Sequence, residues 1–556
     1  MTKRIDRRDG LFLLLFLAAL LLQLRRLPYG AVDADESLYL AIPWRILQGD
    51  AFLIDEWNMS QMNGFLLLPL LWLHRLLHGG GDGAYLAFRG FYLFFHALTA
   101  ALIYLRLRGE NRLAAGAAAL IYTCFNAGGL TALSYNSMAQ GLLIAAGLTL
   151  ACTRNRPGEA LFAGLCFAGA VLCNPFLLFV YVLYTLALLL LRRRAALRVW
   201  AWFTLGCAIL AALFFLLLRL HAGPDFLREL LECLPHVVVD EAHPARTPLQ
   251  VLRESYRSGL RFNSHFREVL LGSVLLAALI LLDRKSRARR WLYLALASAM
   301  TLVFALPYLV TYRLDNFLMF PFSILGFFAY LLCQRRPTRL MLLLYLPGML
   351  YWYCVSAASN LGFAAVCGAS SVNLAASLLF LGRLLEELWP EGGLSRLGSS
   401  LAGLTVAALS AALLTTVVIA PFAAKDDLRR CEVGCLRGIW MPSAMQEELT
   451  REYEALAPLR ELPEGRVVYL SLDSIDSYRY LEDGKRCGAY SPWLPPEEAE
   501  VMAAKLEKYW VLRPENRADY IWIKQAQRGN EALYAAFPDY EAVPCPQGVI
   551  LSRRAS

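Results

Sequence analysis

The stretch LFLLLFLAALLLQLRRLPYGAVDADESLYLAIPWRILQGD, residues 11–50, decides the fold class, because a long apolar run leads directly into a cluster of acids. Crossing about 30 Å of hydrocarbon takes roughly 20 apolar residues. Similar runs recur as far as Ala420, 58% of the 556 residues are hydrophobic, and the mean hydropathy is +0.45. We therefore predict a polytopic membrane protein made mainly of transmembrane helices, since a backbone in lipid must satisfy its own hydrogen bonds.

About thirteen spans are predicted from these runs, with a margin of one or two. They cover residues 11–27, 84–105, 113–130, 137–152, 159–173, 175–191, 199–220, 267–282, 291–310, 316–333, 339–356, 366–383 and 400–420. The basic segment MTKRIDRRDG before the first run is compatible with a signal peptide, but no A-x-A-like cleavage site precedes the acids. We expect an uncleaved first span.

Short turns rich in arginine fall at every second connection between the spans. They are residues 106–112, 154–156, 192–194, 283–290 and 334–339. Because arginine and lysine accumulate in cytoplasmic loops, we expect these turns and the N-terminus to be cytoplasmic. The same alternation predicts that the first loop (28–83), the long loop 221–266 and everything after residue 421 are extracytoplasmic. The net charge of +9 is spread over these turns and does not form a patch for nucleic acid.

The chain changes character after the last span, so we divide it into a transmembrane domain (1–420) and an extracytoplasmic domain (421–556). Helical patterns at 444–456 and 497–509 alternate with β-rich runs RVVYLSL, DYIWIK and GVILSR, which predicts a small α/β domain. It contains four of the 13 cysteines: Cys431, Cys435, Cys487 and Cys545. Two disulfides in any of three pairings and free thiols are both open.

The first extracytoplasmic loop contains two apolar segments that are too short to cross the bilayer. Apolar side chains spaced four apart from Leu38 predict a helix on the membrane surface, kinked or restarted at Pro43. Residues 64–78 predict a half-embedded or interfacial helix. In the polar segment between them, we expect Asp55 and Glu56 to face solvent.

The motif Asp35-Glu36-x-x-Tyr39, followed by Gly49-Asp50 and an amphipathic run, resembles the first external loop of GT-C superfamily glycosyltransferases. The likeness is to the branch of the protein O-mannosyltransferases and aminoarabinose transferases, whose donors are polyprenyl-phosphate sugars. It implies eleven to thirteen spans, an essential acid in this loop and no required cofactor. Two positions differ from the pattern: Gln61, Met62 and Asn63 replace a basic residue with prolines, and Asn174-Pro175 replaces Lys-Pro.

Transfer of a sugar to a hydroxyl needs a base near the acceptor and positive charge near the departing phosphate. The resemblance assigns the base to Asp35, with Glu36 as a second catalytic candidate that orients a neighbour or shares a metal. Asp33 and Asp35 have the spacing to share a divalent ion if this segment is extended, although the branch does not generally need a metal. The alternative is that Asp33, Asp35 and Glu36 only cap the helix that begins near Ser37.

The remaining candidates for substrate binding are dispersed along the chain. Arg313, in a turn that resembles the family's phosphate-side motif, is the expected phosphate partner, or else an arginine that snorkels to the interface. The other candidates are Tyr39, Asn63, Tyr135 and Asn136. The loop 221–266 is long enough to act as a lid. Arg45, Arg75 and Arg89 are further candidates for the phosphate partner, and each is expected at the interface rather than at the site.

The sequence leaves two other functions open. A transporter or lipid flippase is the general alternative for a protein with many spans, and a polysaccharide polymerase or ligase would use the same kind of donor. Transporters usually bury ionisable residues near the middle of the membrane, whereas the clear charges here gather at the ends of the spans. We therefore predict a polyprenyl-phosphate-dependent glycosyltransferase whose acceptor is a glycan, a lipid or a protein of the cell envelope.

Overall fold

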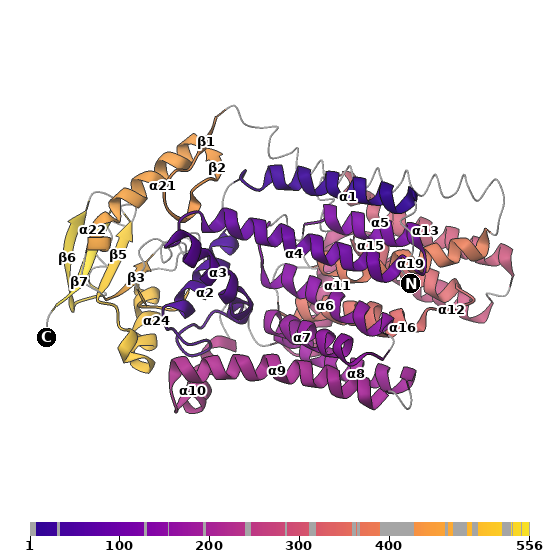
Figure 1. Ribbon diagram of the computed structural model, residues 1–556, viewed down its shortest axis with the longest axis horizontal. Helices are drawn as coiled ribbons and strands as arrows, with labels where there is room; N and C mark the ends of the chain where they lie inside the picture. The colour runs from indigo at the N-terminus through magenta and orange to yellow at the C-terminus, as the bar shows by residue number, and fades with distance from the viewer. Residues whose placement is uncertain are drawn as a thin grey trace.

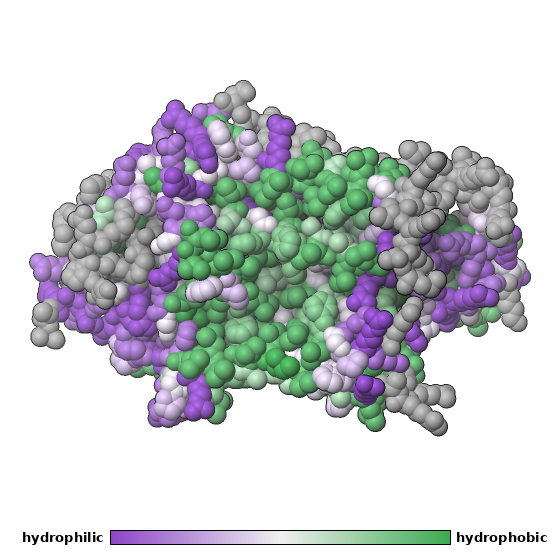
Figure 2. All heavy atoms as spheres, viewed as in Figure 1, coloured by the Kyte–Doolittle hydropathy of each residue, from purple (hydrophilic) through white to green (hydrophobic). Residues whose placement is uncertain are grey.

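The protein is a helical bundle with a smaller α/β domain packed against one end (Figure 1). The computed structural model describes residues 7–30, 34–126, 131–153, 155–192, 196–238, 246–283, 286–310, 319–358, 363, 367–389, 427–461, 465–470, 486–491, 499–524, 535, 537–545 and 548–554. On the face of the bundle seen in Figure 2, hydrophobic side chains form a broad band that is bordered by polar residues on both sides. This distribution is that of an integral membrane protein.

Every predicted span before residue 390 coincides with a helix. The helices are α1 (Arg7–Arg26), α4 (Ala84–Leu107), α5 (Arg112–Cys124), α6 (Tyr135–Cys152), α7 (Pro157–Cys173), α8 (Leu178–Arg192), α9 (Ala196–Ala222), α12 (Phe266–Leu282), α13 (Arg287–Val310), α15 (Met319–Leu332), α16 (Thr338–Leu340), α17 (Leu346–Ala358) and α19 (Ser371–Leu388). The π-helix η5 (Met341–Tyr345) joins α16 to α17, and the short turns η3 (Pro175–Leu177) and η6 (Cys367–Ser370) precede α8 and α19.

By length and composition, four of the described helical stretches can cross a membrane. They are Ala84–Leu107, Ala196–Ala222, Thr338–Ala357 and Cys367–Leu388. The pair formed by α11 (Pro248–Phe262) and α12 makes a fifth if the two helices, bent by 115°, count as one span. The total of about thirteen stays a prediction, and the span predicted at 400–420 lies outside the described residues.

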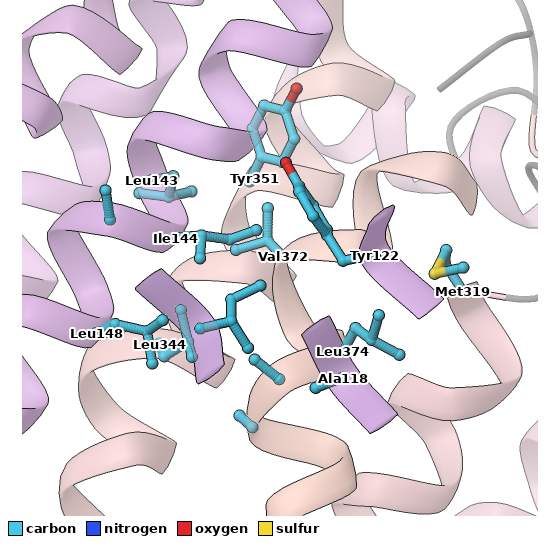
Figure 3. Packing of buried hydrophobic residues seen from close by; sticks show 14 of the residues in the cluster. Ala118, Tyr122, Leu143, Ile144, Leu148, Met319, Leu344, Tyr351, Val372 and Leu374 are labelled. Carbon is cyan, nitrogen blue, oxygen red and sulfur yellow. The ribbon is translucent and has the colours of Figure 1, made fainter. Parts of the chain in front are cut away.

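The bundle core is built from aliphatic and aromatic side chains of α5, α6, α15, α17 and α19, which interdigitate around Tyr122, Ile144 and Leu374 (Figure 3). Small residues bring some helices close together. A Cβ on Gly164 would lie 2.0 Å from the carbonyl oxygen of Phe203, and one on Gly206 would lie 2.3 Å from that of Leu161. Glycine is therefore required where α7 crosses α9, as is common for helices packed in lipid.

The described parts of the arginine-rich turns, near residues 106, 290 and 334, lie at the end of the bundle opposite the α/β domain (Figure 1). Glu387, at the end of α19, is paired with Arg290 and accepts a hydrogen bond from the backbone of Gln334 at 2.9 Å. Arg106 pairs with Glu159 at 3.1 Å. The structure thus places turns that are far apart in sequence on one side, as the alternation predicted; which side is cytoplasmic stays a prediction. We call the opposite end the domain end.

The α/β domain has a five-stranded mixed sheet with the order β4-β3-β5-β7-β6. Its strands are β3 (Arg466–Leu470), β4 (Arg486–Cys487), β5 (Tyr520–Lys524), β6 (Tyr540–Cys545) and β7 (Gly548–Arg553), and its helices are α21 (Ser443–Ala455), α22 (Ala457–Glu461) and α24 (Ala499–Leu512). The register is fixed by pairs such as Val468 with Ile521 and Trp522 with Ile550. The predicted strands and helices of this domain are confirmed. The strands β4 and β6 and a small hairpin were not predicted from the sequence.

That hairpin, β1 (Leu428–Arg430) and β2 (Trp440–Pro442), attaches the domain to the bundle. The backbone of Trp440 donates to the carbonyl of Pro28 at 2.6 Å, and Gly83 donates to the carbonyl of Gly434 at 3.1 Å. The hairpin therefore contacts the ends of α1 and α4 together. The alternative of two disulfides is wrong in this structure, because the buried Cys487 is a free thiol.

The first loop forms two helices at the domain end, α2 (Ala34–Leu47) and α3 (Gly64–His78), and α2 continues through Pro43 without a break. The prediction of a surface helix is wrong for α2. Its apolar stripe, which includes Leu38 and Ile42, is buried against Phe214 of α9, and Ala41 packs under Trp522 of the α/β domain. In contrast, α3 exposes a row of large apolar side chains such as Leu76 and Leu77, as an interfacial helix would.

Candidate active site

Asp35 lies in the first turn of α2, at the domain end of the bundle, and its side chain is partly exposed. It accepts a hydrogen bond from the hydroxyl of Tyr39, one helical turn away, at 3.5 Å. The ring of Tyr39 meets that of Tyr135 edge to face, with 5.8 Å between the ring centroids. The structure thus brings together three residues that the sequence selected from two separate segments.

The first turn of α6 forms the adjoining wall. Ser134 caps this helix: its side chain accepts a hydrogen bond from the backbone amide of Ser137, and the side chain of Ser137 accepts one from the backbone amide of Ser134. This capping box fixes the start of the helix at Tyr135. Asp35 acts electrostatically on Tyr135. Next to Tyr135, Asn136 accepts hydrogen bonds from the hydroxyl of the buried Tyr351 at 3.3 Å (main chain) and 3.4 Å (side chain). The N-termini of α2 and α6, both electropositive ends, therefore converge around the Asp35 carboxylate.

Glu36 points away from this group and into a buried ion pair. Its two carboxylate oxygens accept from Nε and Nη2 of Arg89 at 2.7 and 2.8 Å. Arg89 also donates to the carbonyl of Leu27 at 2.9 Å. Glu36 thereby joins the start of α2 to α4 and to the end of α1, and this geometry favours a positioning role over a catalytic one. Arg89 itself is only 3% exposed, so its expected interfacial location is wrong.

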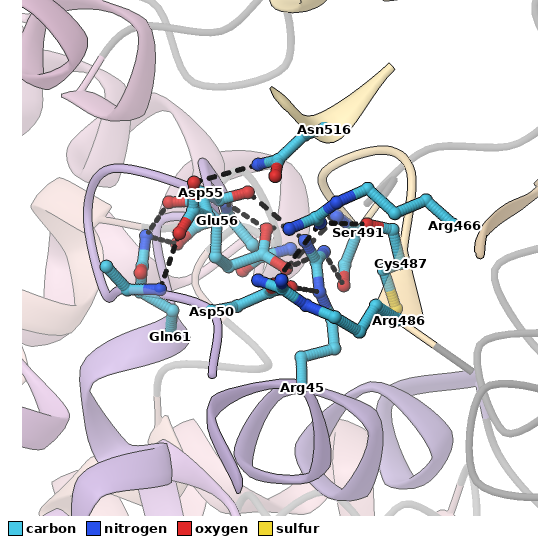
Figure 4. Close-up of polar contacts among 12 residues, drawn as sticks. Arg45, Asp50, Asp55, Glu56, Gln61, Arg466, Arg486, Cys487, Ser491 and Asn516 are labelled. Atoms are coloured by element: carbon cyan, nitrogen blue, oxygen red, sulfur yellow. Dashed lines mark hydrogen bonds and ion pairs between the residues drawn. The ribbon is translucent and has the colours of Figure 1, made fainter. Parts of the chain in front are cut away.

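A second group of acids in the same loop is neutralised by buried arginines (Figure 4). Arg45, with no exposed surface, pairs with Asp50 at 3.0 Å and with Glu56 at 2.6 Å. Glu56 also accepts from the backbone amide of Ser491 in the α/β domain. Burial opposes the charge on Arg45, but attraction to Glu56 raises its pKa above the ordinary value. Arg45 is therefore a buried structural cation and not the interfacial residue that was expected.

Asp55 continues this group toward α24 and toward α10 (Phe226–Val238). It accepts from Nε of Arg513 at 2.9 Å and from the side-chain amide of Asn516 at 2.8 Å. Arg513 pairs in addition with Glu229 of α10 at 2.5 Å. The first loop, α10 and the α/β domain thus meet at one guanidinium group.

The prediction that Asp55 and Glu56 face solvent is wrong, because both are at least 96% buried in this network. Glu56 pairs with the nearby Arg45, but other partners of the two acids, Ser491 and Arg513, lie more than 400 positions later in the chain. Local sequence shows only a polar segment and gives no indication of these partners. A recognisable signal was Arg45 itself, since an arginine inside an apolar helical pattern usually has an anionic partner.

The other predicted site residues are less informative. Asn63 is 1% exposed at the start of α3, and its described contacts do not reach Asp35. Asp33 and Arg313 lie outside the described residues. Of the predicted lid, α10 and α11 are helices, while residues 239–245 are outside the described part. No group of three His, Cys, Asp or Glu side chains among the described residues is arranged to hold a metal ion.

No family model matches the sequence, and no curated protein matches it significantly. Solved structures do resemble the fold. ArnT from Cupriavidus metallidurans bound to undecaprenyl phosphate aligns with a TM-score of 0.48 and 12% identity over 98% of each chain. The archaeal oligosaccharyltransferase AglB from Archaeoglobus fulgidus, in complex with an inhibitory peptide and a dolichol-phosphate, aligns with a TM-score of 0.47 and 12% identity over 98% of this chain and 74% of that one. Both neighbours are GT-C superfamily glycosyltransferases, but values this low do not assign a function.

Proposed function

We propose that this protein is a membrane glycosyltransferase that transfers a sugar from a polyprenyl-phosphate donor to an envelope acceptor, on the extracytoplasmic side. The observation that carries the proposal is the place of Asp35. This acid belongs to the motif that resembles GT-C first loops, it stays partly exposed, and it lies where two helix N-termini converge at the domain end. Most other acids of that loop form buried ion pairs with arginines.

The chemistry assigned to Asp35 is general base catalysis. Its carboxylate takes the proton of an acceptor hydroxyl while the oxygen bonds to the anomeric carbon of the donor sugar. The bond from that carbon to the phosphate oxygen breaks in the same step, and the lipid phosphate leaves as an anion. Tyr135, whose ring is half-buried, is suited to position the sugar, since aromatic rings pack against its apolar faces. Tyr39 is only 3% exposed and acts through its hydroxyl, which donates to Asp35.

The leaving phosphate requires compensating positive charge. We assign this role to Arg313, in keeping with the family motif, together with the helix N-termini beside Asp35. No cofactor is needed for this scheme. A divalent ion shared by Asp33 and Asp35 remains the alternative for phosphate binding.

The α/β domain and the Glu36–Arg89 pair serve to orient the site. Arg89 fixes the first turn of α2, which carries Asp35, while the buried arginine network fixes the far end of the same helix. A helix anchored at both ends places its first carboxylate accurately, and accurate placement is a large part of catalysis.

The test is deletion of the gene followed by mass spectrometry of the extracted lipids. The proposal expects a polyprenyl-phosphate sugar to accumulate and one envelope glycan, glycolipid or glycoprotein to lose a sugar. If the protein were a flippase, its deletion would instead leave the lipid-linked sugar on the cytoplasmic leaflet. Membrane-impermeant periodate added to intact cells would not oxidise the sugar there. Absence of any accumulated lipid-linked sugar, with unchanged envelope glycans, would contradict the proposal.

A further inference from the structure

Helix α11 presents a row of three arginines that the proposed reaction does not use. Arg253, Arg257 and Arg261 are four residues apart, so they lie on one face of the helix. All three side chains are exposed, and their guanidinium groups form no ion pair or hydrogen bond with the described residues. Like charges at this spacing repel one another unless an anion lies between them.

A second face of α11, next to the arginine row, is apolar and exposed. Leu249, Leu252, Tyr256 and Leu260 have 75%, 51%, 38% and 37% of their surface exposed. At 100° per residue they form a strip directly beside the arginines. The third face is buried: Val251 is 2% exposed, and Gly259 lies against the ring of Phe266. A protein-facing side, an apolar strip and a basic row in this order are the pattern of an interfacial helix.

The surroundings place α11 level with the domain ends of the neighbouring helices. Phe262, at its end, packs against Phe363, and Phe266 packs against Phe304 near the domain end of α13. The chain then bends by 115° into α12, a predicted span. α12 also exposes apolar residues, such as Leu271 and Val274. If α12 spans the membrane as predicted, the helix joined to it, α11, lies next to the same bilayer.

The helix is also preformed and locally cationic. Thr247 and Gln250 form a capping box at its start, and the hydroxyl of Tyr353 donates to the carbonyl of Pro248. Its acid, Glu254, is already paired with Arg246 at 3.0 Å. The described residues thus leave the charge of the three arginines of the row uncompensated.

We propose that α11 is a binding site for anionic phospholipids, with headgroup phosphates on Arg253, Arg257 and Arg261 and acyl chains along the leucine strip. An arginine fork matches a phosphate group in geometry and charge. Bound lipid would hold α11, and with it the segment that joins α10 to α12, in a fixed place at the membrane surface. This inference is independent of the proposed sugar transfer.

The experiment is native mass spectrometry of the full-length protein in detergent, titrated with phosphatidylglycerol, with the zwitterionic phosphatidylcholine or with undecaprenyl phosphate. The variant is R253Q/R257Q/R261Q. The matched control, R430Q/R451Q/R554Q, removes the same charge from exposed arginines of the α/β domain. A second variant, R253K/R257K/R261K, restores the charge. Unfolding temperatures in the absence of lipid verify that all variants are folded.

We expect the glutamine variant of α11 to bind phosphatidylglycerol about tenfold or more weakly than the wild type, since each basic residue near anionic lipid contributes appreciably. The control variant should bind as the wild type does, the lysine variant should recover most of the binding, and phosphatidylcholine should not discriminate among them. Equal binding of phosphatidylglycerol by the wild type and the glutamine variant would overturn the proposal. So would a loss confined to undecaprenyl phosphate, which would assign the row to a donor, or a change of oligomeric state without a change in lipid binding.

Discussion

The first loop contains two groups of acids that look alike in sequence and differ in structure. Asp35 is partly exposed and contacts the hydroxyl of Tyr39. Asp50, Asp55 and Glu56, fifteen to twenty-one residues further on, are at least 96% buried and are paired with arginines. The difference teaches that acids of one loop can have different environments: Asp50, Asp55 and Glu56 hold the loop in place through buried ion pairs, whereas Asp35, to which we assign the chemistry, is partly exposed.

The division follows from electrostatics. A buried carboxylate loses its hydration and requires a cation and hydrogen bonds in exchange, so once it is fully paired it is poorly suited to accept a proton. A helix N-terminus, where Asp35 lies, favours a negative charge without a buried cation as partner. Glu36 belongs with the structural acids, because Arg89 holds both of its oxygens.

The largest expected effect within the structural group comes from Glu56→Gln. Removal of this charge leaves Arg45 buried with only part of its compensation, so we expect the free energy of unfolding to fall by about 3–5 kcal/mol. Denaturant unfolding followed by tryptophan fluorescence measures this change. Glu447→Gln, which breaks an exposed pair with Arg429, is the control and should leave the unfolding curve unchanged. Equal unfolding curves for Glu56→Gln and Glu447→Gln would show that the buried network does not stabilise the protein.

Glu36→Gln should destabilise the protein by about 3 kcal/mol, because Arg89 would lose its buried partner. Sugar transfer should fall in parallel with the fraction of folded protein. It should recover at lower temperature, where more of the variant is folded, as expected of a positioning residue. Comparison of unfolding midpoint and sugar transfer in the same membranes tests this. A variant that keeps its stability and loses turnover would move Glu36 into the reactive group.

Arg513→Gln should have a smaller effect of about 1–3 kcal/mol, since Asp55 retains the hydrogen bond from Asn516. Hydrogen exchange should accelerate in residues 50–56 and in α10, the two segments that Arg513 joins. Arg517→Gln, whose partners Glu507 and Asp539 are more exposed, is the matched control. Acceleration confined to α24 itself would show that Arg513 does not couple these segments.

The smallest effect concerns pH. His236 of α10 stacks on Trp57 of the first loop at 4.8 Å, and its pKa is lowered, first by burial and then by the charge of Lys508. Below about pH 6.5 the unfolded chain binds a proton that the folded protein disfavours, so stability should decline as pH falls through this value. His236→Gln should show a smaller decline in unfolding temperature between pH 7.5 and 5.5. An identical decline in both proteins would mean that other groups set the pH dependence.

Much of the bundle could be predicted from sequence, because periodicity and hydropathy are local. The spans before residue 390, the strand RVVYL at 466–470 and the interfacial character of α3 all followed from patterns within a few turns. The burial of α2 could not, since its covering residues Leu456 and Trp522 belong to another domain. Hydrophobic spacing alone does not distinguish a membrane surface from a protein surface.

The same limit applies to the site. Asp35, Tyr39 and Tyr135 were selected from sequence, and the structure places them together. The prediction that Asp55 and Glu56 face solvent was wrong because Arg513, which pairs with Asp55, and Ser491, which covers Glu56, are remote in sequence. Tyr351, which holds Asn136, carried no local signal, since a tyrosine in an apolar run is ordinary core.

The central claim, that Asp35 is the reactive acid of this loop, is tested most directly in the deletion strain. The strain is complemented with wild type, Asp35→Asn or Asp82→Asn, and the polyprenyl-phosphate sugar is quantified by mass spectrometry at matched protein levels. Asp82 is an exposed carboxylate of the same loop and serves as the control. We expect Asp35→Asn to accumulate the lipid to the level of the empty strain, consistent with loss of a base worth about 10²–10⁴ in rate, while Asp82→Asn clears it as the wild type does. Clearance by a folded Asp35→Asn variant would contradict the account.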